Sequence, residues 1–257
     1  MNENGKLAGG FQWAGSDALS EAQHNTRIRS VIIPAMILPF LGALVYFVFA
    51  GGGNLTKIAY SATKLFTFVW PVIAVIFILK QKLKWPRLKE SHHWKTLPLG
   101  VLVGAGIVGL MFLLMQTSLG AQVKSSATNM QEAVGEFGLT QSNYWLFAVF
   151  LSVFHSLLEE YYWRWFVFGG LHQMMSPGWA HVLAGIAFMG HHIIVLLQYF
   201  PVPLTLFLCL MIGVGGVIWS WMYLRQGSLM GAWIAHMIVD FGALWIGYQL
   251  IFGAPSL

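Results

Sequence analysis

The chain has 257 residues, of which 57% are hydrophobic and only 9% are charged. A soluble domain carries about 25% charged residues, so this composition excludes a water-soluble globular protein and indicates an integral membrane protein. The formal net charge of +5 does not indicate a nucleic-acid-binding protein, because the basic residues gather in one short stretch between two apolar runs, KQKLKWPRLKESHHWK.

Runs of about 20 apolar residues are long enough to cross the hydrocarbon core of a bilayer. By this criterion we expect an all-α, polytopic bundle of about seven spans and no separate soluble domain. The expected spans are residues 30–50, 62–80, 97–118, 143–168, 177–199, 203–224 and 229–251.

The basic residues predict the orientation of the chain, because short cytoplasmic loops carry an excess of Lys and Arg. With a cytoplasmic N-terminus, eleven basic residues fall in inner segments and three, Lys57, Lys64 and Lys124, fall outside. We therefore expect a multi-pass protein of the inner or plasma membrane. Four parts follow in order: a polar cytoplasmic segment (1–29), N-terminal transmembrane helices (30–118), an extracytoplasmic loop (119–142) and a helical core (143–251).

The fourth expected span contains two adjacent acids, Glu159 and Glu160, followed by Arg164. Ionisable groups at membrane depth mark functional sites, because each costs about 3 kcal/mol or more to insert unless it is paired. Glu160 and Arg164 lie four residues apart and share a helix face, so they can form an ion pair that supports the helix. Glu159 is rotated by about 100°, toward His155 and Trp163, and is left free for chemistry.

Two later spans supply imidazole groups. Phe188 and His192 lie four residues apart on the fifth span, and His236 and Asp240 do so on the seventh. A carboxylate beside an imidazole fixes its tautomer and raises its basicity. Residue counts from the helix ends place Glu159, His192 and His236 within roughly 10 Å of one another in depth.

Buried carboxylates and imidazoles suit general acid–base catalysis near neutral pH. Glu159, helped by a histidine, could deprotonate a water molecule for attack on an amide carbonyl. The other histidine and its Asp could donate to the oxyanion that forms. Peptide hydrolysis without a covalent intermediate fits this set of residues best.

Three motifs occur in order: EEYYWR at 159–164, FMGHH ending at His192, and HMIVD at 236–240. They resemble the EExxxR, FxxxH and HxxxN/D signatures of the CAAX prenyl protease and bacteriocin-processing (CPBP or Abi) family, which includes Rce1-like enzymes. The resemblance covers residues 143–251. It implies an Rce1-like core and an intramembrane, glutamate-dependent endopeptidase that needs no cofactor and cleaves a membrane-associated peptide or protein.

The resemblance also implies roles for individual residues. Glu159 would activate the attacking water with the help of His192, while His236 and Asp240 would form the oxyanion site. Glu160 and Arg164 would support the helix geometry.

The sequence departs from the family pattern at several positions. Trp165 follows the motif arginine where many members have glycine, and Asp240 stands where prenyl-protein proteases often have Asn. His155 and His191 are additions that could crowd the cavity or bind a ligand.

Two alternatives remain open. Glu159, His192, His236 and Asp240 are acceptable ligands for a divalent metal such as zinc, although no HExxH helix is present. The chain could instead be a noncatalytic CPBP-like membrane protein, such as an immunity factor, a scaffold or an accessory subunit of a membrane complex. A proton-relay transporter is less favoured because the sequence shows no inverted halves.

Overall fold

The structure is a computed structural model that describes residues 21–81, 91–136 and 138–253. Within these ranges the chain forms helices and turns and no strand. The elements are α1 (Glu21–Leu44), η1 (Val45–Phe49), α2 (Gly53–Ile73), η2 (Ala74–Ile78), α3 (Ser91–Trp94), α4 (Leu97–Leu114), α5 (Ser118–Ser125), α6 (Ala127–Glu136), α7 (Tyr144–Val149), η3 (Phe150–His155), α8 (Ser156–Glu159), η4 (Glu160–Phe168), α9 (Gly169–Met174), α10 (Pro177–Leu196), α11 (Val202–Gln226) and α12 (Leu229–Phe252). The elements labelled η are π-helical.

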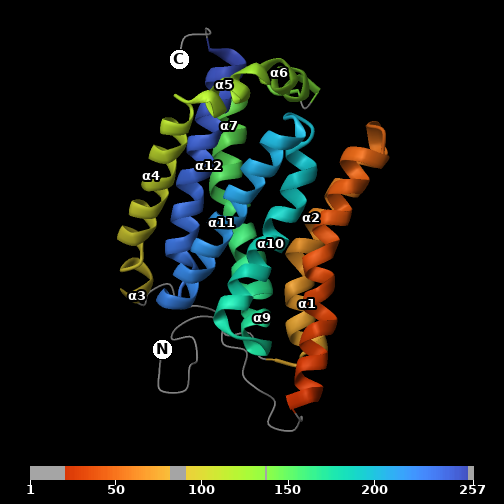
Figure 1. Cartoon of the computed structure of the whole chain (residues 1–257). Helices are drawn as coiled ribbons and strands as arrows, with labels where there is room; N and C mark the ends of the chain where they lie inside the picture. Colours follow the sequence, from red (N-terminus) through yellow and green to blue (C-terminus); the bar gives the residue numbers. More distant parts are fainter. Residues whose placement is uncertain (1–20, 82–90, 137, 254–257) are drawn as a thin grey trace.

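Six helical stretches in the described ranges are long and apolar enough to cross a membrane. They are Ala22–Phe49, Gly53–Ile78, His92–Leu114, Pro177–Leu196, Val202–Gln226 and Leu229–Phe252. The remaining expected span, 143–168, falls in one continuous helical run from α7 to α9, in which η3 and η4 interrupt the α-helix (Figure 1). The chain is therefore a multi-pass, all-α membrane protein, as predicted.

The last three expected spans agree with α10, α11 and α12 to within a few residues because clear local signals mark their ends. Pro177 occupies the first turn of α10, where its missing N–H is not needed. Gly227 ends α11 in the left-handed conformation, with φ of +63°. The Ser228 hydroxyl then accepts a hydrogen bond from the Met230 N–H at 3.2 Å and caps α12.

The first two spans begin earlier than predicted. Helix α1 starts at Glu21 rather than near residue 30, and residues 1–20 of the predicted polar segment lie outside the described residues. Helix α2 starts at Gly53 rather than at 62, after a turn in which Gly51, Gly52 and Gly53 all have positive φ. Lys64, assigned to the outer side although it fell at the start of the expected span, therefore lies about three turns inside α2.

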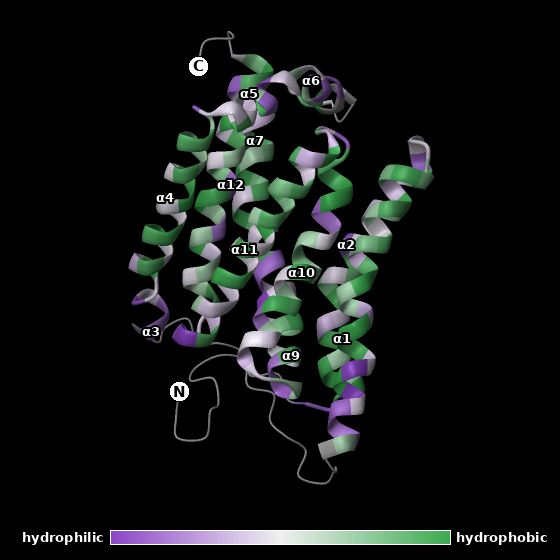
Figure 2. Cartoon of the chain, viewed as in Figure 1, coloured by the Kyte–Doolittle hydropathy of each residue, from purple (hydrophilic) through white to green (hydrophobic). Residues whose placement is uncertain are grey.

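The predicted outer loop at 119–142 is largely helical. It contains α5 and α6, which lie together at one end of the bundle, beside the C-terminal end of α12 (Figure 1). The long helices consist largely of hydrophobic residues (Figure 2), and many of their large apolar side chains are exposed, as expected for contact with lipid tails.

Glycines at two of four positions on α4 allow it to approach α12 closely. A β-carbon at Gly100 would lie 2.5 Å from the carbonyl oxygen of Gly231, and one at Gly104 would lie 3.0 Å from that of Ala235. Gly106 and Gly109 have nothing within 4 Å of an added β-carbon. Beyond Gly104 the contact continues with the small residue on the other helix, since a β-carbon at Gly242 of α12 would lie 2.6 Å from the Val108 side chain of α4.

A second close contact between glycines joins α10 to α11. A β-carbon at Gly185 would lie 2.9 Å from the carbonyl oxygen of Gly213, and one at Gly216 would lie 3.1 Å from the Phe188 ring. This close packing sets Phe188 and the histidines that follow it at a fixed height beside α11.

Helices α1 and α2 are attached to the core by buried side chains that bond to backbone carbonyls. The Tyr162 hydroxyl of η4 donates to the Ala35 carbonyl of α1 at 2.7 Å. The hydroxyl of Tyr161 donates to Phe68 of α2 at 3.2 Å, and Trp70 Nε1–H donates to Val31 at 3.1 Å. These bonds hold the α1–α2 pair against the helix that carries both glutamates.

Candidate active site

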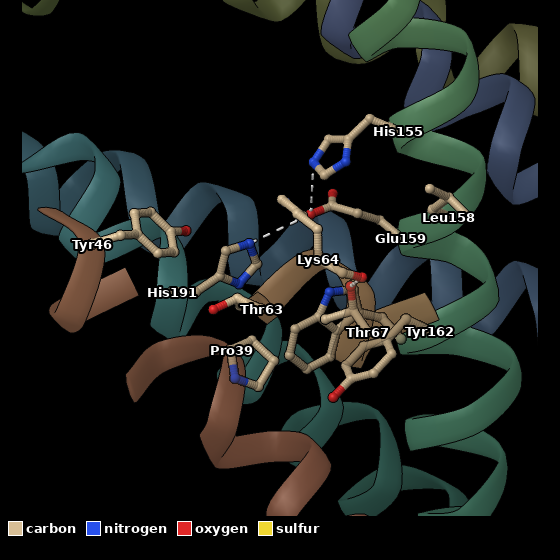
Figure 3. Close-up of a pocket in the computed structure, with 11 residues that line it drawn as sticks. Pro39, Tyr46, Thr63, Lys64, Thr67, His155, Leu158, Glu159, Tyr162 and His191 are labelled. Carbon is tan, nitrogen blue, oxygen red and sulfur yellow. Dashed lines mark hydrogen bonds and ion pairs between the residues drawn. The ribbon is translucent and has the colours of Figure 1, made fainter. Parts of the chain in front are cut away.

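Glu159 lies at the junction of α8 and η4, near the middle of the run from Tyr144 to Met174. Its Oε1 atom lies 3.4 Å from Nε2 of His155 and 3.4 Å from Nε2 of His191 (Figure 3). The contact with His155 confirms that these two residues share a helix face. The residue is buried, with 8% of its surface exposed, so its carboxylate is held mainly by imidazoles rather than by bulk water.

Glu160 points in a different direction and is completely buried. Its Oε2 atom lies 3.3 Å from Nε of Arg164, which confirms the predicted ion pair. The Arg164 guanidinium also lies over the rings of Phe188 and Trp219, at 4.3 and 5.0 Å from their centroids. The pair therefore ties η4 to α10 and α11.

Glu160 has a second partner that the spacing did not predict. The Nδ1–H of His236 donates to Oε1 of Glu160 at 2.7 Å, and the imidazole stacks on the Trp219 ring at 4.2 Å between centroids. The other ring nitrogen, Nε2, lies 3.6 Å from Glu159 and 3.5 Å from Oδ1 of Asp240. His236 is thus enclosed by three carboxylates, and both of its nitrogens face them.

His192 lies beside Glu159 with one ring nitrogen already engaged. Its Nδ1–H donates to the Phe188 carbonyl at 2.9 Å, the residue four positions earlier in α10. In the neutral tautomer this bond leaves a lone pair on Nε2, so His192 can accept a proton there. Ligand atoms of Glu159, His191 and His192 all lie within 4.8 Å of one another.

A small, partly open pocket of about 50 Å³ lies in front of Glu159 (Figure 3). One side consists of residues from the long fourth run and α10, and the other side comes from α1 and α2. The lining residues are Pro39, Tyr46, Thr63, Lys64, Thr67, His155, Leu158, Glu159, Tyr162, Trp163 and His191. His192, His236 and Asp240 are not among these lining residues, and 28% of the Asp240 side chain is exposed.

Residues 141–242 match the family model Rce1-like, described as type II CAAX prenyl endopeptidase Rce1-like. This segment is therefore similar to the Rce1-like family. The match contains all three sequence motifs and every helix that carries a predicted site residue. No curated protein and no solved structure matches the chain. The Rce1-like segment supports a CAAX-protease-like membrane protein, whereas α1 and α2 lie outside the matched residues.

The structure changes the set of residues that could hold a metal. The sequence offered Glu159, His192, His236 and Asp240, but the group that converges is Glu159, His191 and His192. His236 does not belong to this group because Glu160 holds its Nδ1–H. One carboxylate and two imidazoles form a donor set that suits a divalent ion such as zinc.

Some residues of the pocket were not assigned a role from the sequence. His155 and His191 were treated as additions, yet both contact Glu159 directly. Lys64 and Tyr46 were overlooked because they lie outside the Rce1-like segment. One signal was available for Lys64: it falls among apolar residues of a predicted span, where a charged side chain is uncommon.

Proposed function

We propose that this Rce1-like protein is an intramembrane, glutamate-dependent endopeptidase that cleaves a membrane-associated peptide or protein. The strongest support for this proposal is that the two adjacent acids have different surroundings. Glu160 is occupied by Arg164 and His236 inside the protein, whereas Glu159 lines an open pocket among imidazoles. A carboxylate held in this way can act as a general base toward a water molecule in the pocket.

In the proposed reaction, Glu159 takes a proton from water while the water oxygen bonds to the carbonyl carbon of the peptide. His192, with its Nε2 lone pair, assists by accepting a hydrogen bond or a proton near the same water. When the C–N bond breaks, its electron pair goes to nitrogen, and Glu159 returns the proton to the departing amine. The products are a carboxylic acid and an amine, and no covalent enzyme intermediate forms.

His236 and Asp240 belong to the proposed catalytic set as positioning residues. The family resemblance gives them an oxyanion site, but their contacts favour another role. His236 bonds to Glu160 and approaches Glu159 at 3.6 Å, so it fixes both carboxylates relative to each other. Asp240 lies 3.5 Å from His236 and balances positive charge on the imidazole.

Comparison of the membrane peptides of wild-type cells with those of a Glu159→Gln strain tests the proposal. Gln keeps the shape of Glu but cannot take a proton from water, so we expect an uncleaved precursor to accumulate. Glu132→Gln is the matched control, because Glu132 is exposed on α6, away from the pocket. If both strains leave the peptides unchanged, the endopeptidase is refuted and a noncatalytic role as a scaffold or accessory subunit is supported.

We also propose that the N-terminus lies in the cytoplasm and that the membrane is the inner or plasma membrane. With Lys57 and Lys64 inside α2, the outer segments retain one basic residue of the three first assigned to them, Lys124. By the same criterion, four of the eleven basic residues first assigned to the inner side also lie inside helices: Arg27, Arg29, Arg164 and Arg225. Seven basic residues then remain on the inner side against one outside, which still favours a cytoplasmic N-terminus. Protease digestion of tags at either end, in sealed membranes, would test this orientation.

A further inference from the structure

Three imidazoles surround the Glu159 carboxylate closely enough to exchange a proton with it. Oε1 lies 3.4 Å from Nε2 of His155 and 3.4 Å from Nε2 of His191, while Oε2 lies 3.6 Å from Nε2 of His236. Catalytic hydrogen bonds are often this long before a substrate binds. A free imidazole binds a proton about 100-fold more tightly than a free carboxylate does, so a proton that Glu159 takes from water can pass to one of these rings.

Two of the three rings are held by the protein on their far side. His236 donates from Nδ1 to Glu160 and stacks on the Trp219 ring. His191 stacks on the Trp163 ring at 5.6 Å between centroids, with 3° between the planes, and its Nδ1 is buried without a hydrogen bond to any described residue. Neither ring can therefore present its second nitrogen to a substrate in the pocket.

His155 differs from both of these rings. It lines the pocket, and 24% of its side chain is exposed, compared with 12% for His191. Within the described residues its ring approaches one charged group, Glu159, and makes no other hydrogen bond or ring contact. Its Nδ1 atom is not one of the buried polar atoms that lack a partner, so this atom is accessible. One nitrogen of His155 thus faces the base while the other is open.

The local backbone fixes this arrangement. Helix α8 is an α-helical segment between the π-helical η3 and η4, and His155 is the last residue of η3. The spacing of four residues therefore places His155 one turn before Glu159 on the same face. Figure 3 shows the His155 ring on one side of the Glu159 carboxylate and the His191 ring on the other.

Three other proton-bearing groups near this site do not connect Glu159 with the pocket. The Tyr46 hydroxyl and the Lys64 ammonium line the pocket, but within the described residues neither forms a hydrogen bond or ion pair with the glutamate. His192 is not a lining residue, and its Nδ1–H is held by a backbone carbonyl. His155 is therefore the group that combines contact with the base and an open nitrogen.

We propose that His155 is the general acid that protonates the leaving amine. The inference rests on the proposed peptide hydrolysis and specifies the route by which Glu159 returns its proton. The proton taken from water moves from Oε1 of Glu159 to Nε2 of His155, and the imidazolium gives its Nδ1 proton to the amide nitrogen. The C–N bond breaks with its electron pair on nitrogen, and exchange with water in the pocket restores the starting tautomer of the ring.

The test uses the full chain in lipid nanodiscs and the peptide whose cleavage in cells depends on Glu159. This peptide is prepared with its scissile amide and, separately, with a thioester in its place. An amine needs a proton in order to leave, whereas a thiol, with a pKa of about 8.5, leaves as the thiolate. The thioester therefore requires the base but not the acid.

His155→Ala should lower kcat for the amide about 10²–10⁴-fold, the usual contribution of general acid–base catalysis, and should spare the thioester. Added imidazole should restore part of the activity of His155→Ala on the amide. The matched control is His24→Ala, which removes a histidine of α1 outside the pocket and should change neither reaction.

Equal losses for the amide and the thioester would overturn the proposal, because they would show that His155 only holds Glu159 in place. Full activity of His155→Ala on the amide would overturn it as well. If His155→Ala does not fold, His155→Gln decides, since it keeps a polar side chain beside Oε1 and should show the same loss confined to the amide. If Glu159→Gln cleaves the amide, the proposed function fails; if Glu159→Gln is inactive and His155→Ala is fully active, the failure concerns His155 alone.

A second measurement needs no substrate. Diethyl pyrocarbonate acylates neutral imidazoles that it can reach, and mass spectrometry of the digested protein identifies the modified histidines. Because its Nδ1 is open, His155 should be acylated faster than His191 and His236. Acylation of either of these two residues ahead of His155 would overturn the assignment.

Discussion

Glu160→Gln is expected to destabilise the protein more than any substitution on the lipid-facing surface. Glu160 and Arg164 are both almost fully buried, and the Arg164 Nε lies 3.3 Å from Oε2 of Glu160. At that distance and an effective dielectric of about 20, their attraction is about 5 kcal/mol. Gln keeps an acceptor for His236 but removes the charge, so an uncompensated guanidinium remains at membrane depth. Loss of one partner of such a pair costs about 3–5 kcal/mol.

Equilibrium unfolding in mixed detergent micelles measures this loss, and a double-mutant cycle with Arg164→Met isolates the pair. The double variant should lose less free energy of unfolding than the two single losses add up to. The difference should be a few kcal/mol, because neither charge is left buried without its partner. The lipid-facing control is Leu102→Ala, at a side chain that is 69% exposed. Additive single effects, or a loss for Glu160→Gln no larger than that of the control, would refute the interpretation of Glu160 as the buried partner of Arg164.

Three further predictions concern the close contact between α4 and α12, the role of His236, and the presence of a metal ion. Gly100→Val should destabilise the protein by about 1–3 kcal/mol, since its β-carbon meets the Gly231 carbonyl, whereas Gly106→Ala should be nearly neutral in the same unfolding assay. His236→Gln should reduce kcat because Glu159 and Glu160 lose their shared contact; an unchanged kcat would remove His236 from the catalytic set. If Glu159 acts without a metal, proteolysis should continue in the presence of a strong chelator, and elemental analysis of the purified protein should find no stoichiometric zinc. If the chelator abolishes activity and added zinc restores it, a metal site formed by Glu159, His191 and His192 would be favoured instead.

Much of the fold could be predicted from the sequence, because the length of an apolar run sets the number of membrane passes. The ends of α10, α11 and α12 were found because Pro177, Gly227 and Ser228 have specific positions at helix ends. The start of α2 was missed because its first turns are polar. Because α2 begins before the apolar part of the span, Lys64 lies well inside the helix rather than at its start. Hydropathy alone does not predict this earlier start.

Within a single helix the contacting pairs of side chains were predicted correctly, because residues four apart share a face. This holds for Glu160 with Arg164, for His155 with Glu159 and for His236 with Asp240.

Contacts between helices could not be predicted in the same way. The rotation of α10 decides that His191, rather than His192, meets Glu159 within 4 Å, and the rotation of α12 turns His236 toward Glu160. The π-helical segments η3 and η4 also shift the faces of the fourth run, since a π turn contains an extra residue.

The position of α2 determines how a substrate can reach the pocket. Thr63, Lys64 and Thr67 line the pocket, while Leu65 and Phe68 on the same helix are 62% and 57% exposed, as lipid-facing residues are. Helix α2 therefore presents one face to the pocket and another to the hydrocarbon. If the proposed endopeptidase activity holds, a lipid-anchored or membrane-embedded peptide would approach by lateral diffusion, a two-dimensional search in which the bilayer concentrates the substrate and excludes water-soluble chains.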